Sequence, residues 1–129
     1  MDLSKLDTRT TSEQGAVLEL RHPATGERLD SVWIRLAGAD SDIYRRVQNR
    51  IVRRNFNRKG KRSQDEIEEA VIEQLAGITL AWEGIELHGE YLECNQENAQ
   101  RVYQIPWIRE QVAEFVNERA NFLPRYDSD

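Results

Sequence analysis

The sequence has little cysteine, no long apolar run and no cluster of metal-ligating residues. A single cysteine, Cys94, cannot form an internal disulfide, and it fits a reducing cytosol. One cysteine and two histidines at unrelated spacing do not make a metal site, so no metal is expected. No apolar stretch is long enough to cross a bilayer, and the first residues lack the charged-then-apolar pattern of an export signal. We therefore expect a cytoplasmic chain that does not enter a membrane.

The sequence also lacks the patterns typical of catalysis. No serine or cysteine nucleophile stands beside a plausible base, and the glycines are too sparse to form a phosphate-binding loop. The carboxylates are many, but their spacing is that of a solvated helix face rather than a paired acid and base. Neither an enzymatic activity nor a cofactor is therefore expected.

Negative charge predominates, with a net charge of -5, but the two signs are segregated along the chain. Every charged residue from 45 to 62 is basic, and every charged residue from 63 to 100 is acidic. One interpretation is that two solvated helix faces neutralise each other within one subunit. The other is that a molecule with two poles associates with its own kind.

The basic block raises nucleic-acid binding as an alternative function. Arg46, Arg50 and Arg53 line up at helical spacing in an arginine-rich helix expected over 41–58, and basic residues could neutralise several phosphates. Against this, the sequence has no groove-reading motif, its aromatic residues are not interleaved with the arginines, and the whole chain is acidic. No nucleic-acid partner is therefore expected.

The pattern at the N-terminal end predicts a polar tail followed by a β-hairpin. Residues 1–14 are polar apart from Leu3 and Leu6, which could dock the tail. Strands are expected over 15–21 and 29–37, joined by a turn containing proline and glycine. A lone hairpin is marginal in water, so we expect it to pack on helices or on the sheet edge of another subunit.

The rest of the chain predicts about four helices. The first begins at Asp40 or Ser41, and a mobile basic loop follows over 57–63. A capping box at Ser63 starts a second helix, whose apolar side consists of Ile67, Val71, Leu75, Ile78 and Trp82. Residues 83–94 form a loop or a weak edge hairpin. A short helix capped by Asn95 and a longer one starting at Pro106 complete an α+β, helix-rich single domain over 15–124, with a C-terminal tail at 125–129.

The last helix has an apolar stripe with two exceptions, Trp107 and Arg119. The stripe comprises Ile105, Ile108, Val112, Phe115, Val116 and Leu123. Arg119 lies within it, and Trp107 lies off its edge. Each has a structural interpretation, because a tryptophan can close a core and an arginine can extend past a helix end. Each also has a functional one, because both residue types are enriched at interface hot spots.

Seven segments in this order resemble the tail assembly chaperones of long-tailed phages with non-contractile tails, over roughly residues 16–124. The segments are Pro-Ala-Thr-Gly-Glu at 23–27, Trp-Ile-Arg-Leu-Ala-Gly at 33–38, Asp-Ser-Asp at 40–42 with Tyr-Arg-Arg at 44–46, Trp-Glu-Gly-Ile at 82–85, Glu-Asn-Ala at 97–99, Pro-Trp-Ile-Arg-Glu-Gln-Val at 106–112, and Arg-Ala-Asn-Phe-Leu at 119–123.

The resemblance implies a non-enzymatic protein of the bacterial cytoplasm. Such proteins coat the long helical tape-measure protein, keep it soluble, recruit tail-tube protein and are absent from the finished virion. The expected partners are therefore the tape-measure protein, the tail-tube protein and further copies of the chain as a homo-oligomer. Candidate contact residues are Arg46, Arg50, Arg53, Trp33, Trp82, Trp107, Arg119 and Phe122.

Overall fold

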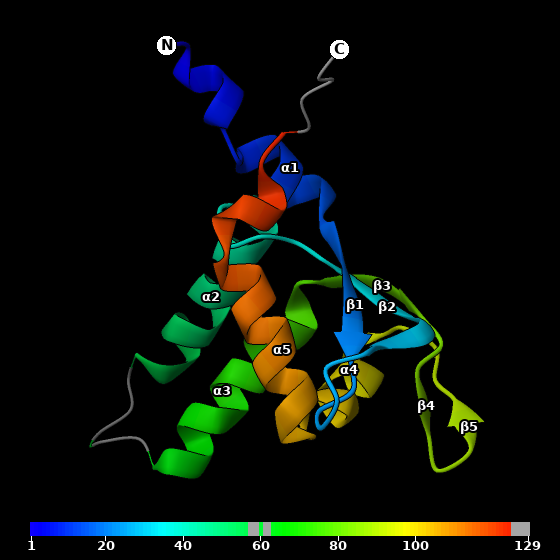
Figure 1. Cartoon of the computed structure of the whole chain (residues 1–129). Coiled ribbons are helices and arrows are strands. Elements are labelled where there is room, and N and C mark those ends of the chain that lie inside the picture. Colours follow the sequence, from blue (N-terminus) through cyan, green and yellow to red (C-terminus); the bar gives the residue numbers. More distant parts are fainter. Residues whose placement is uncertain (57–59, 61–62, 125–129) are drawn as a thin grey trace.

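The chain folds as an antiparallel sheet packed against helices, which confirms the α+β class (Figure 1). The structure is a computed structural model that describes residues 1–56, 60 and 63–124. The mobile loop expected over 57–63 falls mostly outside these residues, and so does the tail expected at 125–129.

The expected N-terminal hairpin is present, but a third strand joins it. Strand β1 (Ala16–Arg21) pairs antiparallel with β2 (Arg28–Leu36), and β2 pairs with β3 (Thr79–Glu83). The helix that we expected to reach Trp82 ends instead at Gly77. The segment after it is rich in strand-forming residues, and pairing with β2 satisfies its backbone N–H and C=O groups. The apolar residues at 78 and 82 therefore lie on the sheet side of the fold.

Residues 83–94 contain the weak hairpin that the pattern allowed. Strands β4 (Glu86–Leu87) and β5 (Glu90–Tyr91) pair antiparallel. The two residues between them, His88 and Gly89, have positive φ angles of 54° and 81°. Positive φ at both central positions is the conformation that a tight two-residue hairpin requires.

Four helices begin where the sequence placed them. The Ser41, Ser63 and Asn95 side chains accept backbone N–H groups at the starts of α2 (Asp42–Asn55), α3 (Gln64–Gly77) and α4 (Gln96–Tyr103). Pro106 opens α5 (Pro106–Asn117). The last helix is shorter than expected, because Glu118 is extended and caps a 3-10 turn, η2 (Arg119–Phe122). Leu123 consequently leaves the apolar stripe and is 39% exposed.

The first residues are helical rather than an irregular tail. They form a 3-10 turn, η1 (Leu3–Leu6), and a short helix, α1 (Arg9–Gln14). Leu3 and Leu6 do not dock this segment, since they are 72% and 41% exposed. Its anchor is polar: Ser12 is buried, and the Thr11 hydroxyl donates to the carbonyl of Phe122.

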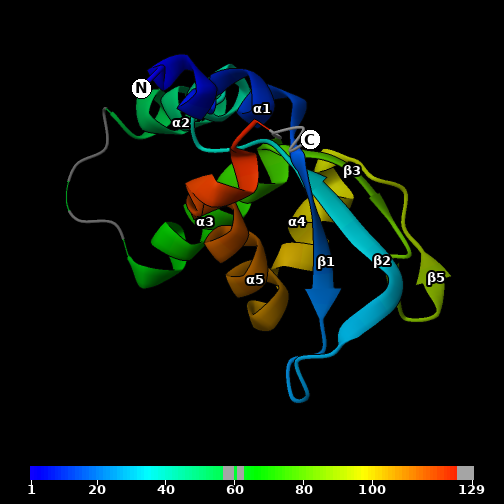
Figure 2. The same ribbon diagram turned by 45° about the horizontal axis from the view of Figure 1, so that its top comes forward.

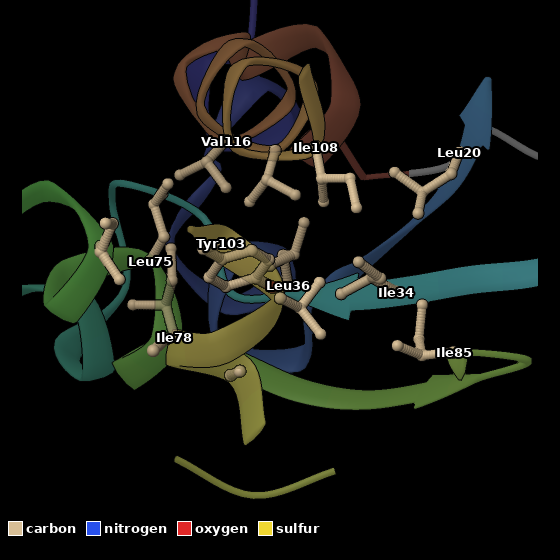
Figure 3. Close-up of a cluster of buried hydrophobic side chains, with 14 of the residues drawn as sticks. Leu20, Ile34, Leu36, Leu75, Ile78, Ile85, Tyr103, Ile108 and Val116 are labelled. Carbon is tan, nitrogen blue, oxygen red and sulfur yellow. The ribbon is translucent and has the colours of Figure 1, made fainter. Parts of the chain in front are cut away.

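The core lies between the sheet and helices α3, α4 and α5 (Figure 3). Tyr103 of α4 lies at its centre, with Leu20, Ile34 and Leu36 of the sheet on one side and Ile108 and Val116 of α5 on another. Helix α3 contributes Ile72, Leu75 and Ala76. The expectation that Ile67 and Val71 face the core is wrong, because α3 turns the 72–75–76 side inward to meet α4 and α5.

A close approach between α2 and α3 gives the first prediction. A Cβ built at Gly77 would lie 2.8 Å from both methyl carbons of buried Val47. Helix propensity alone would make Gly77→Ala stabilising by about 1 kcal/mol. We expect the clash to dominate, so that Gly77→Ala lowers the free energy of unfolding by about 1–3 kcal/mol in urea titrations.

The Val47→Ala background is the control, because it removes the methyl groups that the new Cβ meets. There Gly77→Ala should be neutral or stabilising, by up to about 1 kcal/mol. A stabilising effect of Gly77→Ala in the wild-type background would contradict this packing.

Candidate protein-interaction surface

An apolar groove runs between α2 and α3, and α5 contributes residues to its lining. It encloses about 330 Å³ and is lined by Tyr44, Gln48, Ile51, Val52, Ile67, Ala70, Val71, Gln74, Leu75, Ala113, Val116 and Asn117. Val52, Ile67 and Val71 are 57%, 42% and 40% exposed. Isolated exposed apolar residues are ordinary, but several lining one groove are typical of a binding surface.

The base of the groove is packed and tied together. Ile51, Leu75 and Val116 are buried, so three helices form its floor. The Gln74 side chain donates a 3.1 Å hydrogen bond to the carbonyl of Tyr44, which links α3 to α2 inside the groove. The groove is therefore a formed feature of the fold, with apolar side chains held toward solvent at its rim.

The groove separates a basic helix from an acidic one. After Asp42 every charged residue of α2 is an arginine, and every charged residue of α3 is acidic. Glu73 joins them, with oxygens 2.6 and 3.1 Å from the Arg54 guanidinium and 3.9 Å from Arg50. At Glu73, therefore, the two charge blocks neutralise each other within one subunit.

The predicted arginine stripe lies on one helix and is exposed. Arg46, Arg50 and Arg53 all lie on the solvent side of α2. Arg50 is near Glu73, and the Arg53 Nε donates to the Asn49 carbonyl at 3.4 Å. The stripe thus borders the contact between α2 and α3, and two of its three members also make intramolecular contacts.

The three tryptophans do not form one surface. The Trp33 indole N–H donates to Glu83 at 2.9 Å, across the β2–β3 pair. Trp82 lies opposite buried Ile34 and donates to the Leu92 carbonyl at 2.8 Å, which ties β3 to the segment that follows β5. Trp107 is half-buried at the edge of the core. Each indole therefore has structural contacts, and each keeps some exposed surface.

Arg119 and Phe122 have intramolecular roles. Arg119 binds Asp40 through two hydrogen bonds, Nε to Oδ2 at 2.9 Å and NH2 to Oδ1 at 3.0 Å. Thr8 donates to the same carboxylate, so Asp40 joins η2 to the segment before α1. Phe122 is 2% exposed and packs edge-on against Phe115, so its ring lies in the interior and does not belong to a contact surface.

Two titratable groups outside this surface, one buried and one half-buried, have structural positions. Burial raises the pKa of the Tyr103 hydroxyl, which bonds to the Thr79 hydroxyl at 2.6 Å. Burial also raises the pKa of the Cys94 thiol.

Across residues 1–56, 60 and 63–124, no group of three or more histidine, cysteine, aspartate or glutamate side chains could hold a metal ion. No helix within those residues is long and apolar enough to cross a membrane.

Sequence reasoning missed the groove itself. The sequence pattern places Ile67 and Val71 on the apolar side of their helix, and it gives no role to Val52, which lies off the apolar side that carries Val47 and Ile51. The position of Val52 off that apolar side is itself a signal for an exposed apolar surface. Val52 and Phe56 are one turn apart, and the other outward residues of the helix are mostly arginines.

We compared the chain with protein-family models, with curated proteins and with solved structures, and none of the three comparisons finds a match.

The Asp40 carboxylate gives a pH-dependent prediction. Hydrogen bonds from Arg119 and then from Thr8 lower its folded-state pKa below the ordinary 3.8. A depressed carboxylate pKa contributes stability that is present above the unfolded pKa and is lost as pH falls through the folded one. The stability difference between wild type and Asp40→Asn should therefore be largest above about pH 4 and shrink as the pH falls through the lowered folded-state pKa.

Thermal unfolding across this pH range measures that difference. Asp30→Asn, which removes an exposed carboxylate on β2, is the control for the change in net charge. A difference between wild type and Asp40→Asn that stays constant as the pH falls would contradict the role of the Arg119–Asp40 pair.

Proposed function

We propose that the protein is a tail assembly chaperone of a long-tailed phage with a non-contractile tail. In this role it binds the tape-measure protein, keeps it soluble and recruits tail-tube protein. The resemblance of seven ordered sequence segments over roughly 16–124 supports the family. The observation that carries the binding role is the exposed apolar groove between α2 and α3.

The groove suits a helical partner. An amphipathic helix binds by laying its apolar face into a groove and placing its polar flanks on the rims. Here the apolar residues Val52, Ile67 and Val71 would meet that face. The basic α2 and the acidic α3 would then meet flanks of opposite charge, which favours one orientation of the bound helix. The resemblance implies that the tape-measure protein is such a helical partner.

Self-association and location belong to the same proposal. Arg46 and Arg53 on α2 and Glu69 on α3 are exposed, so charged contacts between copies of the chain are sterically open. The proposed site of action is the bacterial cytoplasm, before the tail is complete, and the finished virion would lack the protein. No chemistry is required of it, because binding alone keeps an apolar helical protein soluble.

Substitution in the groove tests the binding role. Val52→Asp places a charge in the apolar groove at a site that is 57% exposed, so the fold should survive with a melting temperature within a few degrees of wild type. Capture of the co-expressed tape-measure protein should fall about tenfold, because a buried unpaired charge is costly at an interface.

Leu3→Asp is the matched control, an exposed aliphatic residue that is 72% accessible and lies outside the groove. It should leave capture within about twofold of wild type, as expected for a residue away from the contact. Equal capture by wild type and Val52→Asp would remove the groove from the proposed function.

The alternative function, nucleic-acid binding through α2, predicts a DNA complex that survives moderate salt. The proposed function predicts no such complex. Glu73 faces Arg50 and Arg54, and Asp42 pairs with Arg45, so much of the basic helix is already neutralised. We expect no retention of duplex DNA at about 0.2 M salt. A complex that survives this salt, and is lost on replacing Arg46, Arg50 and Arg53 with alanine, would establish the alternative.

A further inference from the structure

A second surface lies on the other side of α5, along the free edge of the sheet. The strand order β1-β2-β3 makes β1 an edge strand. Helix α5 runs alongside β1, as both views show (Figure 1, Figure 2). Between them is a hollow of about 470 Å³. It is lined by Leu18, Glu19, Arg21, His22, Pro23, Gly26, Gln111, Glu114, Phe115, Glu118 and Asn121.

One end of this edge is already paired in the manner of a strand. The Gln111 side-chain amide accepts from the Arg21 backbone N–H at 2.9 Å and donates to the Arg21 carbonyl at 2.8 Å. The next residue, His22, instead donates inward to the Glu27 carbonyl at 2.8 Å. The β1–β2 register shifts between Glu19 and Arg21, but the extra residues lie on β2, and β1 stays one continuous strand with alternating burial. Because backbone groups alternate along such a strand, those of Val17 and Glu19 point to the same outer side as those of Arg21.

The hollow has an apolar base and acidic sides. Leu18 and Phe115 supply the apolar surface, and Val17 at the strand edge is 50% exposed. Glu19 on β1, Glu114 on α5 and Glu118 just after α5 are all exposed along its two sides, and the Glu19 carboxylate also pairs with Arg28 at 2.7 Å. Within the hollow, Arg21 donates to the Gly26 carbonyl and the His22 Nδ1 accepts from Ala24 and Thr25, so these groups are engaged in the β1–β2 turn.

We propose that this edge groove, defined by Leu18, Glu19, Gln111, Glu114 and Phe115, binds an extended protein segment in which apolar and basic residues alternate. The segment would pair with the outer backbone groups of Val17 and Glu19 as a fourth strand. Its apolar side chains would contact Leu18 and Phe115, and its lysine or arginine side chains would meet Glu19 and Glu114. Backbone pairing supplies the fit in such strand addition, and the side pockets supply the sequence preference. This surface is separate from the α2–α3 groove, so each proposal can fail without the other.

The direct test is binding of a designed peptide to the full chain. The probe is a capped, fluorescently labelled peptide of about eight residues that alternates valine and lysine, the length of an ordinary strand. Fluorescence anisotropy should give saturable binding with Kd below about 1 mM. Two control peptides have the same charge: one with all lysines before all valines, and one with alternate backbone nitrogens methylated so that they cannot donate. Both should bind at least about fivefold more weakly.

Two matched variants of α5 test the site on the protein. Glu114→Lys and Glu110→Lys make the same charge change on the same helix, but only Glu114 lines the hollow. Glu114→Lys should weaken binding at least about fivefold and Glu110→Lys less than about twofold. Glu19→Pro removes the outward N–H of the edge strand, which an edge position tolerates, and should also abolish binding. If that variant fails to fold, the methylated peptide tests the companion hydrogen bond of the same pairing, in which a peptide N–H donates to a carbonyl of the edge strand.

Several results would overturn the proposal. They are the absence of saturable binding, equal binding of the block or methylated peptides, and equal effects of Glu114→Lys and Glu110→Lys. A dimer of the chain alone in sedimentation, lost in Glu19→Pro, would assign the edge to a second copy and would also overturn it.

Discussion

The burial of Tyr103 is the contact on which the arrangement of this fold depends. Its ring is fully buried where the helices meet the sheet, and its hydroxyl bonds to Thr79. Thr79 also caps the Leu75 carbonyl near the end of α3, and it begins the strand that pairs with β2. One side chain therefore fixes where α3 stops and where β3 starts. In the resulting packing, α3 is rotated so that Ile72, Leu75 and Ala76 lie inward and Ile67 and Val71 lie outside.

That rotation produces the groove on which the proposed function rests. Helix α3 cannot bury both apolar sides, since α4 and α5 take one of them and α2 is held close at Gly77 and Val47. The remaining apolar residues line a groove between two helices that carry opposite charge. Such a surface suits a protein that must hold a helical partner temporarily and later release it. The apolar contact is modest and lies between charged rims, so the bound partner can dissociate.

Local signals in the sequence predicted much of this fold, and long-range contacts account for what was missed. The caps at Ser41, Ser63 and Asn95 were predictable because each satisfies its own helix within three residues. Strand β3 was not, because its partner lies more than forty residues earlier and its apolar spacing continues that of α3. Of the candidate contacts, Phe122 was misassigned because η2 turns it onto Phe115, a contact that a continuous helix would not make. The Arg119–Asp40 pair likewise depends on tertiary proximity alone.

The claim that the α2–α3 groove receives the tape-measure protein is tested most directly by site-specific photo-crosslinking. A photoreactive phenylalanine analogue would be placed at Val52, in the groove, and separately at Tyr91 on β5, an exposed position outside it. Each variant would be co-expressed with the tape-measure protein and irradiated. A covalent adduct from position 52 and none from position 91 is the predicted result. An adduct from position 91 with none from position 52 would contradict the assignment of the groove.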